Sequence, residues 1–302
     1  DSSYLAVKLK EYELRPLVVH VDAGWNTELA VNNVERIVKY CGYELFTHVV
    51  NWEEVRDLQV AYMRAGVANQ DVVQDHAFFA NLYHFAVKNG IRYVMNGGNI
   101  ATEGVFPQAW HHAAMDASNL HAIHDKFGTV KLRDYKTISF WEYYLYYPFV
   151  RRMTVIRPLD YLVYDKREAL EYLKSEVGYK DYGRKHGESR FTRFFQEHYL
   201  PTKFGYDKRR PHLSSLILSG QMTRDEALSN LEQPMYDERD LRDDLAYVAK
   251  KLGITATELA ALVDGQSRHY TEFSNWDYKY KAMHALKSWL ESTLGTKVKS
   301  HT

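Results

Sequence analysis

The segment from Tyr199 to Arg210, with the sequence YLPTKFGYDKRR, alternates cationic and aromatic side chains. The segment HGESR, residues 186–190, precedes it and adds another cation. A charge run is commonly a solvated surface, but interleaved aromatic rings would hold the cations near apolar walls, where their fields are stronger. Arginine can clamp a phosphate or carboxylate through two hydrogen bonds, and lysine can neutralise a departing pyrophosphate. The residues able to do this chemistry are Arg190, Lys203, Lys208, Arg209 and Arg210.

Polar loops at three places could bind a nucleotide. Asp22-Ala23-Gly24 follows the apolar run at residues 17–21, and Asn96-Gly97-Gly98-Asn99 follows the run at residues 91–95. Asp1-Ser2-Ser3 precedes a helix-like segment, where a serine is commonly an N-cap but where free backbone N–H groups also suit a phosphate. Alone, each of the two loops that follow apolar runs is equally well explained as a turn, and Asp1-Ser2-Ser3 as a helix cap. Together, at the ends of successive elements of one fold, they predict a nucleotide site.

Other reactive residue types give weaker signals. Gln74-Asp75-His76 opens an expected helix over residues 75–88, with Asp75 as its N-cap, and whether His76 faces the nucleotide site stays open. Cys41 lies near the end of an amphipathic segment and is expected to be a buried small residue rather than a nucleophile. The pairs His111/His112 and His121/His124 could bind a metal, but their spacing fits loose surface histidines better.

These candidates need a scaffold, and the order of apolar and amphipathic segments predicts one. Short apolar runs suit strands, and the segments between them suit helices. The alternation predicts an α/β fold with a doubly wound, mostly parallel, Rossmann-like sheet, in which ligands bind beyond the carboxyl ends of the strands. The expected strands are residues 17–21, 45–50, 91–95 and 155–159, and the expected helices are residues 2–12, a segment opened by Asn26, a segment capped by Asn51 with Glu54, residues 75–88, and a segment capped by Asp165 with Glu168.

The rest of the chain predicts a helical extension. Residues 106–152 suggest an aromatic-rich, mostly helical insertion, and strand signals stop after Gly178. Two capping boxes, each a threonine followed three residues later by a glutamate, begin at Thr223 and Thr255. The predicted organisation is an ATP-binding domain over 1–178, a helical substrate region over 179–264, and a linker with a final amphipathic helix over 265–302, which is expected to pack on its own domain rather than dock a partner.

Composition narrows the class of protein. Basic and acidic residues are equal at 39 each, which argues against a dedicated nucleic-acid binder. No apolar run is long enough for a bilayer and no signal-peptide pattern is present, so a cytoplasmic protein without a membrane partner is expected. One cysteine in 302 residues excludes an internal disulfide framework.

With these residues in place, the chain resembles the N-acetyl sugar amidotransferases, a PP-loop family of O-antigen and related glycan biosynthesis. The resemblance covers Asp1 to about Val263, and the YLPTKFGYDKRR motif is its most specific part. Asp1-Ser2 resembles the end of the family's Ser-Gly-Gly-x-Asp-Ser loop, whose earlier residues would lie upstream. The other matching motifs are HVDAGW (20–25), QDHAFF (74–79), NGGN (96–99) with TEG (102–104), HGESRFT (186–192) and LSGQMT (218–223).

The resemblance implies an adenine-nucleotide α-hydrolase fold and an enzyme that uses ATP and Mg²⁺. Such an enzyme adenylates the amide oxygen of a UDP-linked acetamido sugar or uronate, and ammonia then displaces AMP to leave an acetamidino group. Ammonia would come from a partner glutaminase through a barrel subunit similar to the histidine-biosynthesis pair. A zinc-binding cysteine cluster is common near the start of such proteins and would lie upstream.

The resemblance also implies roles for individual residues. Nucleotide contacts fall on Asp1, Ser2, Val21, Asp22, Gly97, Gly98 and Asn99, with Asp1 and Glu103 as Mg²⁺ ligands. Catalytic roles fall on Lys203, Asp207, Lys208 and Arg209, and substrate contacts on Gln74, His76, His186, Glu188, Arg190 and Arg210. Two alternatives remain at this point. One is another PP-loop adenylating ligase, such as a tRNA-modifying enzyme, and the other is a non-catalytic nucleotide-binding assembly subunit.

Overall fold

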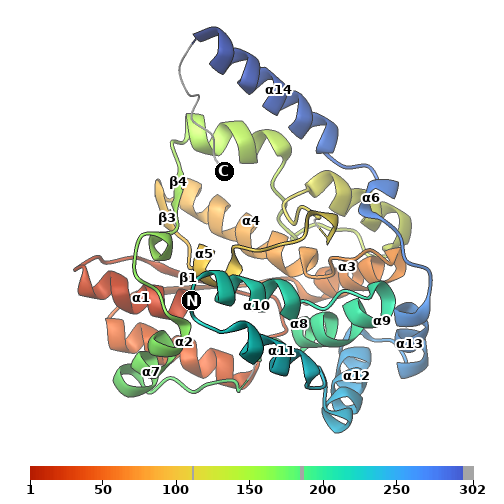
Figure 1. Cartoon of the computed structure of the whole chain (residues 1–302). Helices are drawn as coiled ribbons and strands as arrows, with labels where there is room; N and C mark the ends of the chain where they lie inside the picture. Colours follow the sequence, from red (N-terminus) through yellow and green to blue (C-terminus); the bar gives the residue numbers. More distant parts are fainter. Residues whose placement is uncertain (111, 184–186, 295–302) are drawn as a thin grey trace.

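The computed structural model describes residues 1–110, 112–183 and 187–294, and these are mainly helical (Figure 1). The strands are β1 (Val18–Asp22), β2 (Leu45–Val49), β3 (Tyr93–Met95) and β4 (Thr154–Ile156). The α-helices are α1 (Ser2–Glu11), α2 (Glu28–Cys41), α3 (Trp52–Ala65), α4 (Val72–Lys88), α5 (Ile100–Glu103), α6 (Ala117–Phe127), α7 (Lys166–Val177), α8 (Arg190–Phe194), α9 (Leu200–Phe204), α10 (Arg209–Leu218), α11 (Arg224–Glu232), α12 (Glu238–Leu252), α13 (Ala256–Asp264) and α14 (Asp277–Leu294). Shorter turns are the 3₁₀ helices η1 (Gln108–Trp110), η3 (Pro158–Asp160) and η5 (Tyr270–Glu272) and the π-helices η2 (Glu142–Val150) and η4 (Phe195–Tyr199).

The expected strands and helices of the first half are present, with shifted ends. β4 stops at Ile156 because Pro158 opens a 3₁₀ turn. α2 begins at Glu28, since the side chain of Thr27, not Asn26, accepts a hydrogen bond from the backbone N–H of Ala30. The prediction that Asp75 caps α4 is wrong. The helix begins three residues earlier, at Val72, so Asp75 lies within its first turn.

The strands form two separate parallel pairs, β1 with β2 and β3 with β4. An apolar cavity of about 610 Å³, here called the interstrand slot, is lined by β1 and β3 together with α1 and α4. Strand residues alternate the side to which their backbone groups point. Val18 donates to Glu44 on the β2 side, and Thr154 donates to Arg92 on the β4 side. The backbone groups of the intervening residues, such as Val19 and Tyr93, therefore face away from the paired strands.

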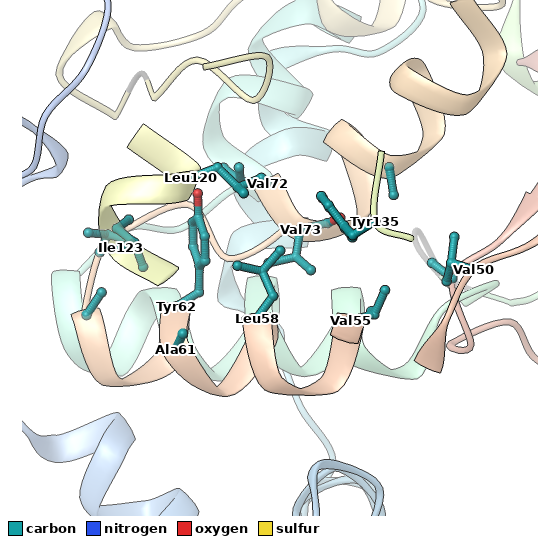
Figure 2. Close-up of a cluster of buried hydrophobic side chains, with 14 of the residues drawn as sticks. Val50, Val55, Leu58, Ala61, Tyr62, Val72, Val73, Leu120, Ile123 and Tyr135 are labelled. Carbon is teal, nitrogen blue, oxygen red and sulfur yellow. The ribbon is translucent and has the colours of Figure 1, made fainter. Parts of the chain in front are cut away.

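α3 is the central packing element. One side joins α4 and α6 through a cluster that includes Leu58, Tyr62 and Leu120, all with no exposed surface (Figure 2). Its other side contributes to a second cluster with α8, α12 and α13, which includes Phe191 and Val248. α3 therefore fixes the C-terminal helices against the strand-bearing part of the chain.

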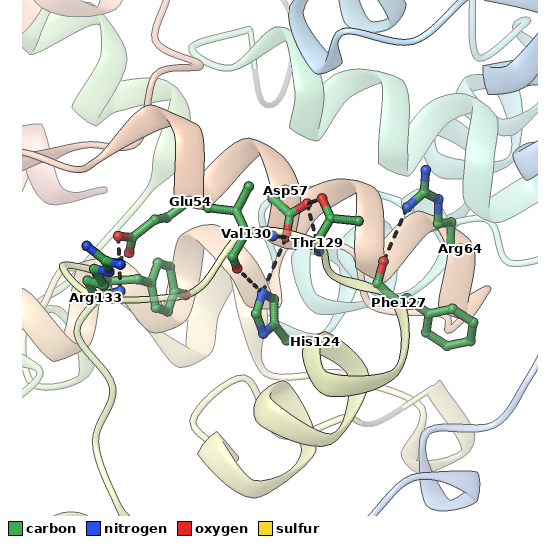
Figure 3. Close-up of polar contacts among 9 residues, drawn as sticks. Glu54, Asp57, Arg64, His124, Phe127, Thr129, Val130 and Arg133 are labelled. Carbon is green, nitrogen blue, oxygen red and sulfur yellow. Dashed lines mark hydrogen bonds and ion pairs between the residues drawn. The ribbon is translucent and has the colours of Figure 1, made fainter.

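Two acidic side chains on α3 hold the loop that follows α6 (Figure 3). Glu54 was expected to complete the capping box at Asn51. Instead its carboxylate accepts hydrogen bonds from the backbone N–H groups of residues 133–135, while Asn51 caps alone. Asp57 accepts from the backbone N–H groups of Thr129 and Val130. Burial by itself raises the pKa of Asp57, but these hydrogen bonds outweigh it and lower the pKa below its usual value.

The second half is helical, as expected. Both capping boxes, at Thr223 with Glu226 and at Thr255 with Glu258, are present. Residues 106–152 are less regular than expected, because loops surround α6 and η2. α14 projects from the body of the molecule (Figure 1). No helix within the described residues has both the length and the apolarity to cross a membrane.

Candidate functional site

A cavity of about 650 Å³, here called the central cavity, brings together several elements that are distant in sequence. Its walls come from the start of α1, the loops after β1 and β3, the first turn of α4, the α8–η4 segment and the residue before α10. Eight of the residues predicted for the site line it, namely Asp1, Ser2, Gln74, Gly97, Gly98, Glu103, Glu188 and Lys208.

The start of α1 lies directly against the loop after β3. A Cβ added to Gly97 would lie 2.5 Å from Oγ of Ser2 and 2.6 Å from its backbone N and Cα. Asn96 shapes the loop by accepting a hydrogen bond from the Gly98 N–H at 2.7 Å. The N-terminal end of a helix presents unpaired N–H groups and a positive dipole end, and here that end faces a cavity. These features suit a phosphate chain.

The other predicted nucleotide contacts lie outside the lining of this cavity. Val21 is buried in β1, and Asp22 shapes the following turn by accepting from Gly24 N–H and from the amide of Asn26. Asn26 itself lines the cavity. Asn99 caps α5 through its side-chain oxygen, which accepts from Thr102 N–H at 2.8 Å.

Lys208 contributes a cation to the lining of the central cavity, close to several carboxylates. Its ammonium lies 4.6 Å from the ring centroid of Phe106. Burial lowers the pKa of Lys208, while the charges of Asp71, Asp75 and Glu103 oppose that shift. Within the described residues its ammonium makes no hydrogen bond or ion pair. Lys208 is thus a half-buried cation available to a ligand.

Two residues of the QDH motif have different roles. Gln74 lines the cavity and donates to Asp71 Oδ1 at 3.2 Å. His76 has no exposed surface, donates from Nδ1 to the carbonyl of Ala114, and accepts at Nε2 from Ile138 N–H. Burial lowers the pKa of His76 to about 4, so it is a neutral structural histidine.

Several predicted cations are already used by the fold. Arg190 pairs with Asp244 at 2.5 Å and stacks on Tyr247. Lys203 donates to the carbonyls of Leu262, Val263 and Gly265 at the end of α13. Neither Lys203 nor Arg190 lines the central cavity.

Asp207 and Arg209 also lie beside the cavity rather than in its wall. They pair with each other at 2.9 Å, and Arg209 donates to the carbonyls of Asn230 and Gln233 at the end of α11. Arg210 is exposed, and His186 lies outside the described residues.

Residues that sequence reasoning missed complete the wall. The carboxylate of Asp71 accepts from Thr192 as well as from Gln74, and η4 brings Gln196 to its second oxygen at 3.4 Å. Lys166, at the start of α7, lies close to Glu103 and Glu188 and lines two neighbouring cavities. The i,i+4 spacing of Asp71 and Asp75 was a usable signal, but it required the correct start of α4.

The donor set suits a divalent cation held jointly with phosphates. Asp1 and Glu103 both line the central cavity. The hydroxyl of Tyr164 donates to Asp1 Oδ1, and a Cβ added to Gly98 would lie 3.6 Å from Oε2 of Glu103. No group of three potential metal-binding side chains occurs among residues 1–110, 112–183 and 187–294. Mg²⁺ typically takes one or two carboxylates and completes its shell with phosphate and water oxygens, so these residues fit it.

Comparison with known proteins finds a family that is similar to the C-terminal part of the chain. Residues 188–287 match the family described as LPS biosynthesis protein WbpG-like, C-terminal domain. This range includes Glu188, Lys208 and the YLPTKFGYDKRR motif, and it extends past Gly265 into α14, which the sequence motifs did not reach. No curated protein gives a significant match. Residues 188–287 are therefore similar to the C-terminal domain of WbpG-like LPS biosynthesis proteins.

Proposed function

We propose that this protein is an ATP-dependent amidotransferase that converts the N-acetyl group of a nucleotide-linked acetamido sugar or uronate into an acetamidino group. The observation that carries the proposal is the meeting of a helix start, a glycine loop and the cation Lys208 in one cavity. The match to an LPS biosynthesis family favours a sugar over other acceptors of the adenylyl group. The product would enter O-antigen synthesis.

The proposed chemistry has two steps. In the first, the amide oxygen of the sugar attacks the α-phosphorus of ATP, the bond to the β-phosphate oxygen breaks, and pyrophosphate leaves. In the second, ammonia adds to the amide carbon and the carbon–oxygen bond breaks, so AMP departs with the former amide oxygen. The protein's contribution is positioning and charge stabilisation.

The position of each residue in the central cavity suggests its role in the reaction. The start of α1 at Ser2 and the backbone of Gly97 and Gly98 would hold the phosphates, and Asp1 and Glu103 would hold Mg²⁺. Bound Mg²⁺ would supply positive charge that offsets the acidic lining of the cavity. Lys208 would stabilise the departing pyrophosphate.

Aromatic side chains offer a surface for the sugar. Trp110 and Tyr206 stack at 4.5 Å between ring centroids, and both line the central cavity. Apolar ring faces suit the apolar face of a pyranose, while Gln196 supplies an amide nearby. Arg190 and Arg209 are paired with carboxylates. Either arginine could bind an anionic group of the sugar only after its ion pair had opened.

The ammonia would come from a partner glutaminase. The chain's cysteine, Cys41, is buried, and its thiol lies 3.7 Å from the carbonyl oxygen of Ala6. Burial raises the pKa of the Cys41 thiol, the opposite of what a glutaminase nucleophile needs.

The proposed doubly wound sheet would contain both parallel strand pairs. Two-stranded sheets are marginally stable alone, and α1 and α4 cover the slot between them. We infer that a further parallel strand of this protein, leading into Asp1, fills the interstrand slot and joins the pairs into one sheet.

This inference predicts slow amide exchange on both sides of the slot. Amides of Val19, Val21, Tyr93 and Met95 would be hydrogen-bonded to the added strand, and should exchange about as slowly as the amides of Val18 and Asn96, which donate within the existing pairs. Residue-resolved hydrogen exchange of the protein measures this. Fast exchange at the four slot-facing amides alone would show that the slot is empty.

The proposed function is tested by product analysis. The protein would be incubated with Mg-ATP, ammonium and a panel of UDP-linked diacetamido sugars and uronates. We expect one of them to stimulate release of AMP and pyrophosphate and to gain the mass change of one oxygen replaced by NH. Cleavage of ATP to ADP, or AMP release stimulated by tRNA instead of a sugar, would refute the sugar assignment.

A further inference from the structure

Asp75 differs from the carboxylate one helical turn before it. Asp71 Oδ1 accepts hydrogen bonds from Gln74 and Thr192, and its Oδ2 accepts from Gln196. Asp75 lines the same cavity, but within the described residues its carboxylate makes no hydrogen bond or ion pair. Asp71 is therefore fixed by the fold, whereas Asp75 presents free oxygen atoms to a ligand.

The surroundings make Asp75 a stronger base than an exposed aspartate. Burial and the negative charge of Asp71 raise its pKa, and the positive charge of Lys208 opposes this. Burial raises the pKa of the Tyr135 hydroxyl, and the nearby charge of Asp75 raises it further. Glu103 faces Lys208 from α5. A carboxylate whose pKa is raised toward neutral pH can both accept and release a proton during a reaction.

The proposed reaction needs a proton acceptor. The imidate formed by adenylation is neutral once the amide nitrogen has released its proton to solvent. When ammonia adds to the carbon of this imidate, its lone pair forms the new C–N bond, and the electron pair of the C–O bond leaves with AMP. The nitrogen that came from ammonia must then lose one proton to a base, and the more basic imine nitrogen takes one up from solvent, because an amidine is protonated at neutral pH. Of the other carboxylates in the cavity lining, Asp71 is occupied by its hydrogen bonds. Asp1 and Glu103 are assigned to Mg²⁺, and Glu188 lies close to the charge of Lys166.

We propose that Asp75 is the general base that accepts this proton from the attacking ammonia. The role rests on the proposed amidotransferase function and adds a residue to it. The carboxylate lies at the start of α4, on the same cavity wall as Gln74, and the free ammonium of Lys208 lines the same space. Asp75 releases the proton to solvent once AMP has left.

The test separates the two steps of the reaction. Sugar-dependent exchange of pyrophosphate into ATP reports adenylation, and amidine formation reports ammonia transfer. Asp75→Asn is expected to keep the exchange within a few-fold and to lose amidine formation with ammonia by about 100-fold or more. Hydroxylamine should restore the second step, because its adduct is a stronger acid and loses its proton to water. Asp75→Glu should recover part of the ammonia rate.

A charge-matched control is Asp71→Asn, which removes a carboxylate from the same turn. This variant is expected to lower the rate of the second step by the same factor with ammonia as with hydroxylamine. Ammonia-dependent amidine formation at the normal rate in Asp75→Asn, or an equal loss with both nucleophiles, would overturn the role of Asp75. If the unaltered protein shows no sugar-dependent exchange, the proposed function itself fails, and the role of Asp75 fails with it.

Discussion

Replacing Lys208 with methionine is expected to lower sugar-dependent AMP formation by roughly 100-fold or more without unfolding the protein. Its ammonium lines the central cavity and has no hydrogen-bond partner among the described residues, so the fold loses little when it is removed. Burial already lowers its pKa, which means that its charge is costly in the absence of a ligand. The measurement is steady-state AMP release, alongside a thermal melt.

Lys203 provides the matched control five residues earlier. Its ammonium donates to three carbonyls at the end of α13 and lies outside the cavity lining. Lys203→Met should therefore cost about 1–3 kcal/mol of stability, because those carbonyls lose a charged donor, while the folded fraction keeps its activity. If the two variants exchange these phenotypes, the assignment of Lys208 to the reacting phosphates is wrong.

Gly97→Ala is expected to abolish ATP binding and to destabilise the protein. The added Cβ would lie 2.6 Å from the backbone N and Cα of Ser2, and backbone atoms cannot swing away as a flexible side chain can. The start of α1 would have to move off the loop after β3. Overpacking of this kind costs about 1–3 kcal/mol, and the displaced N–H groups could no longer face a phosphate. Nucleotide titration and denaturant unfolding measure the two effects.

Gly98→Ala is the neighbouring comparison. Its added Cβ would first meet the side-chain oxygen of Asn96 at 3.1 Å and then Oε2 of Glu103 at 3.6 Å, both of which are side-chain ends. We expect near-normal stability in this variant. Equal destabilisation by both substitutions would show that the contact between Ser2 and Gly97 is not what makes the first position sensitive.

Local signals in the sequence predicted much of the fold. The two capping boxes, the cap at Asp165 and the short apolar runs are each encoded within a few residues. Asp165 accepts from two N–H groups of α7, as its spacing to Glu168 suggested. Where neighbouring residues determine an element, sequence patterns are sufficient to place it within a few positions.

The roles of the cations could not be predicted in the same way, because their partners are distant in sequence. Arg190 pairs with Asp244, 54 residues away, and Lys203 reaches carbonyls 59 to 62 residues away. The cations between residues 190 and 210 therefore have two roles. Arg190, Lys203 and Arg209 hold α8, α11, α12 and α13 in place, while Lys208 faces the cavity.

For Asp75 the error is the reverse: a residue expected to serve only the fold lies in the cavity wall. Asp75 has the residue type and position of a helix cap, and this local explanation hid its place in the cavity wall. Only the true start of α4 puts the two carboxylates one turn apart on the side that faces Lys208. The charge balance of the cavity is a property of the assembled fold, since α4, α5 and the residue before α10 each contribute to it.

The most direct test of the proposed function follows one oxygen atom. The acetamido sugar would be prepared with oxygen-18 in its amide carbonyl and turned over with Mg-ATP and ammonium. If the amide oxygen is adenylated and then displaced, the label must appear in the phosphate of AMP, and the amidine must contain none. Label that stays in the sugar, or that appears in pyrophosphate or water, would contradict the proposed mechanism.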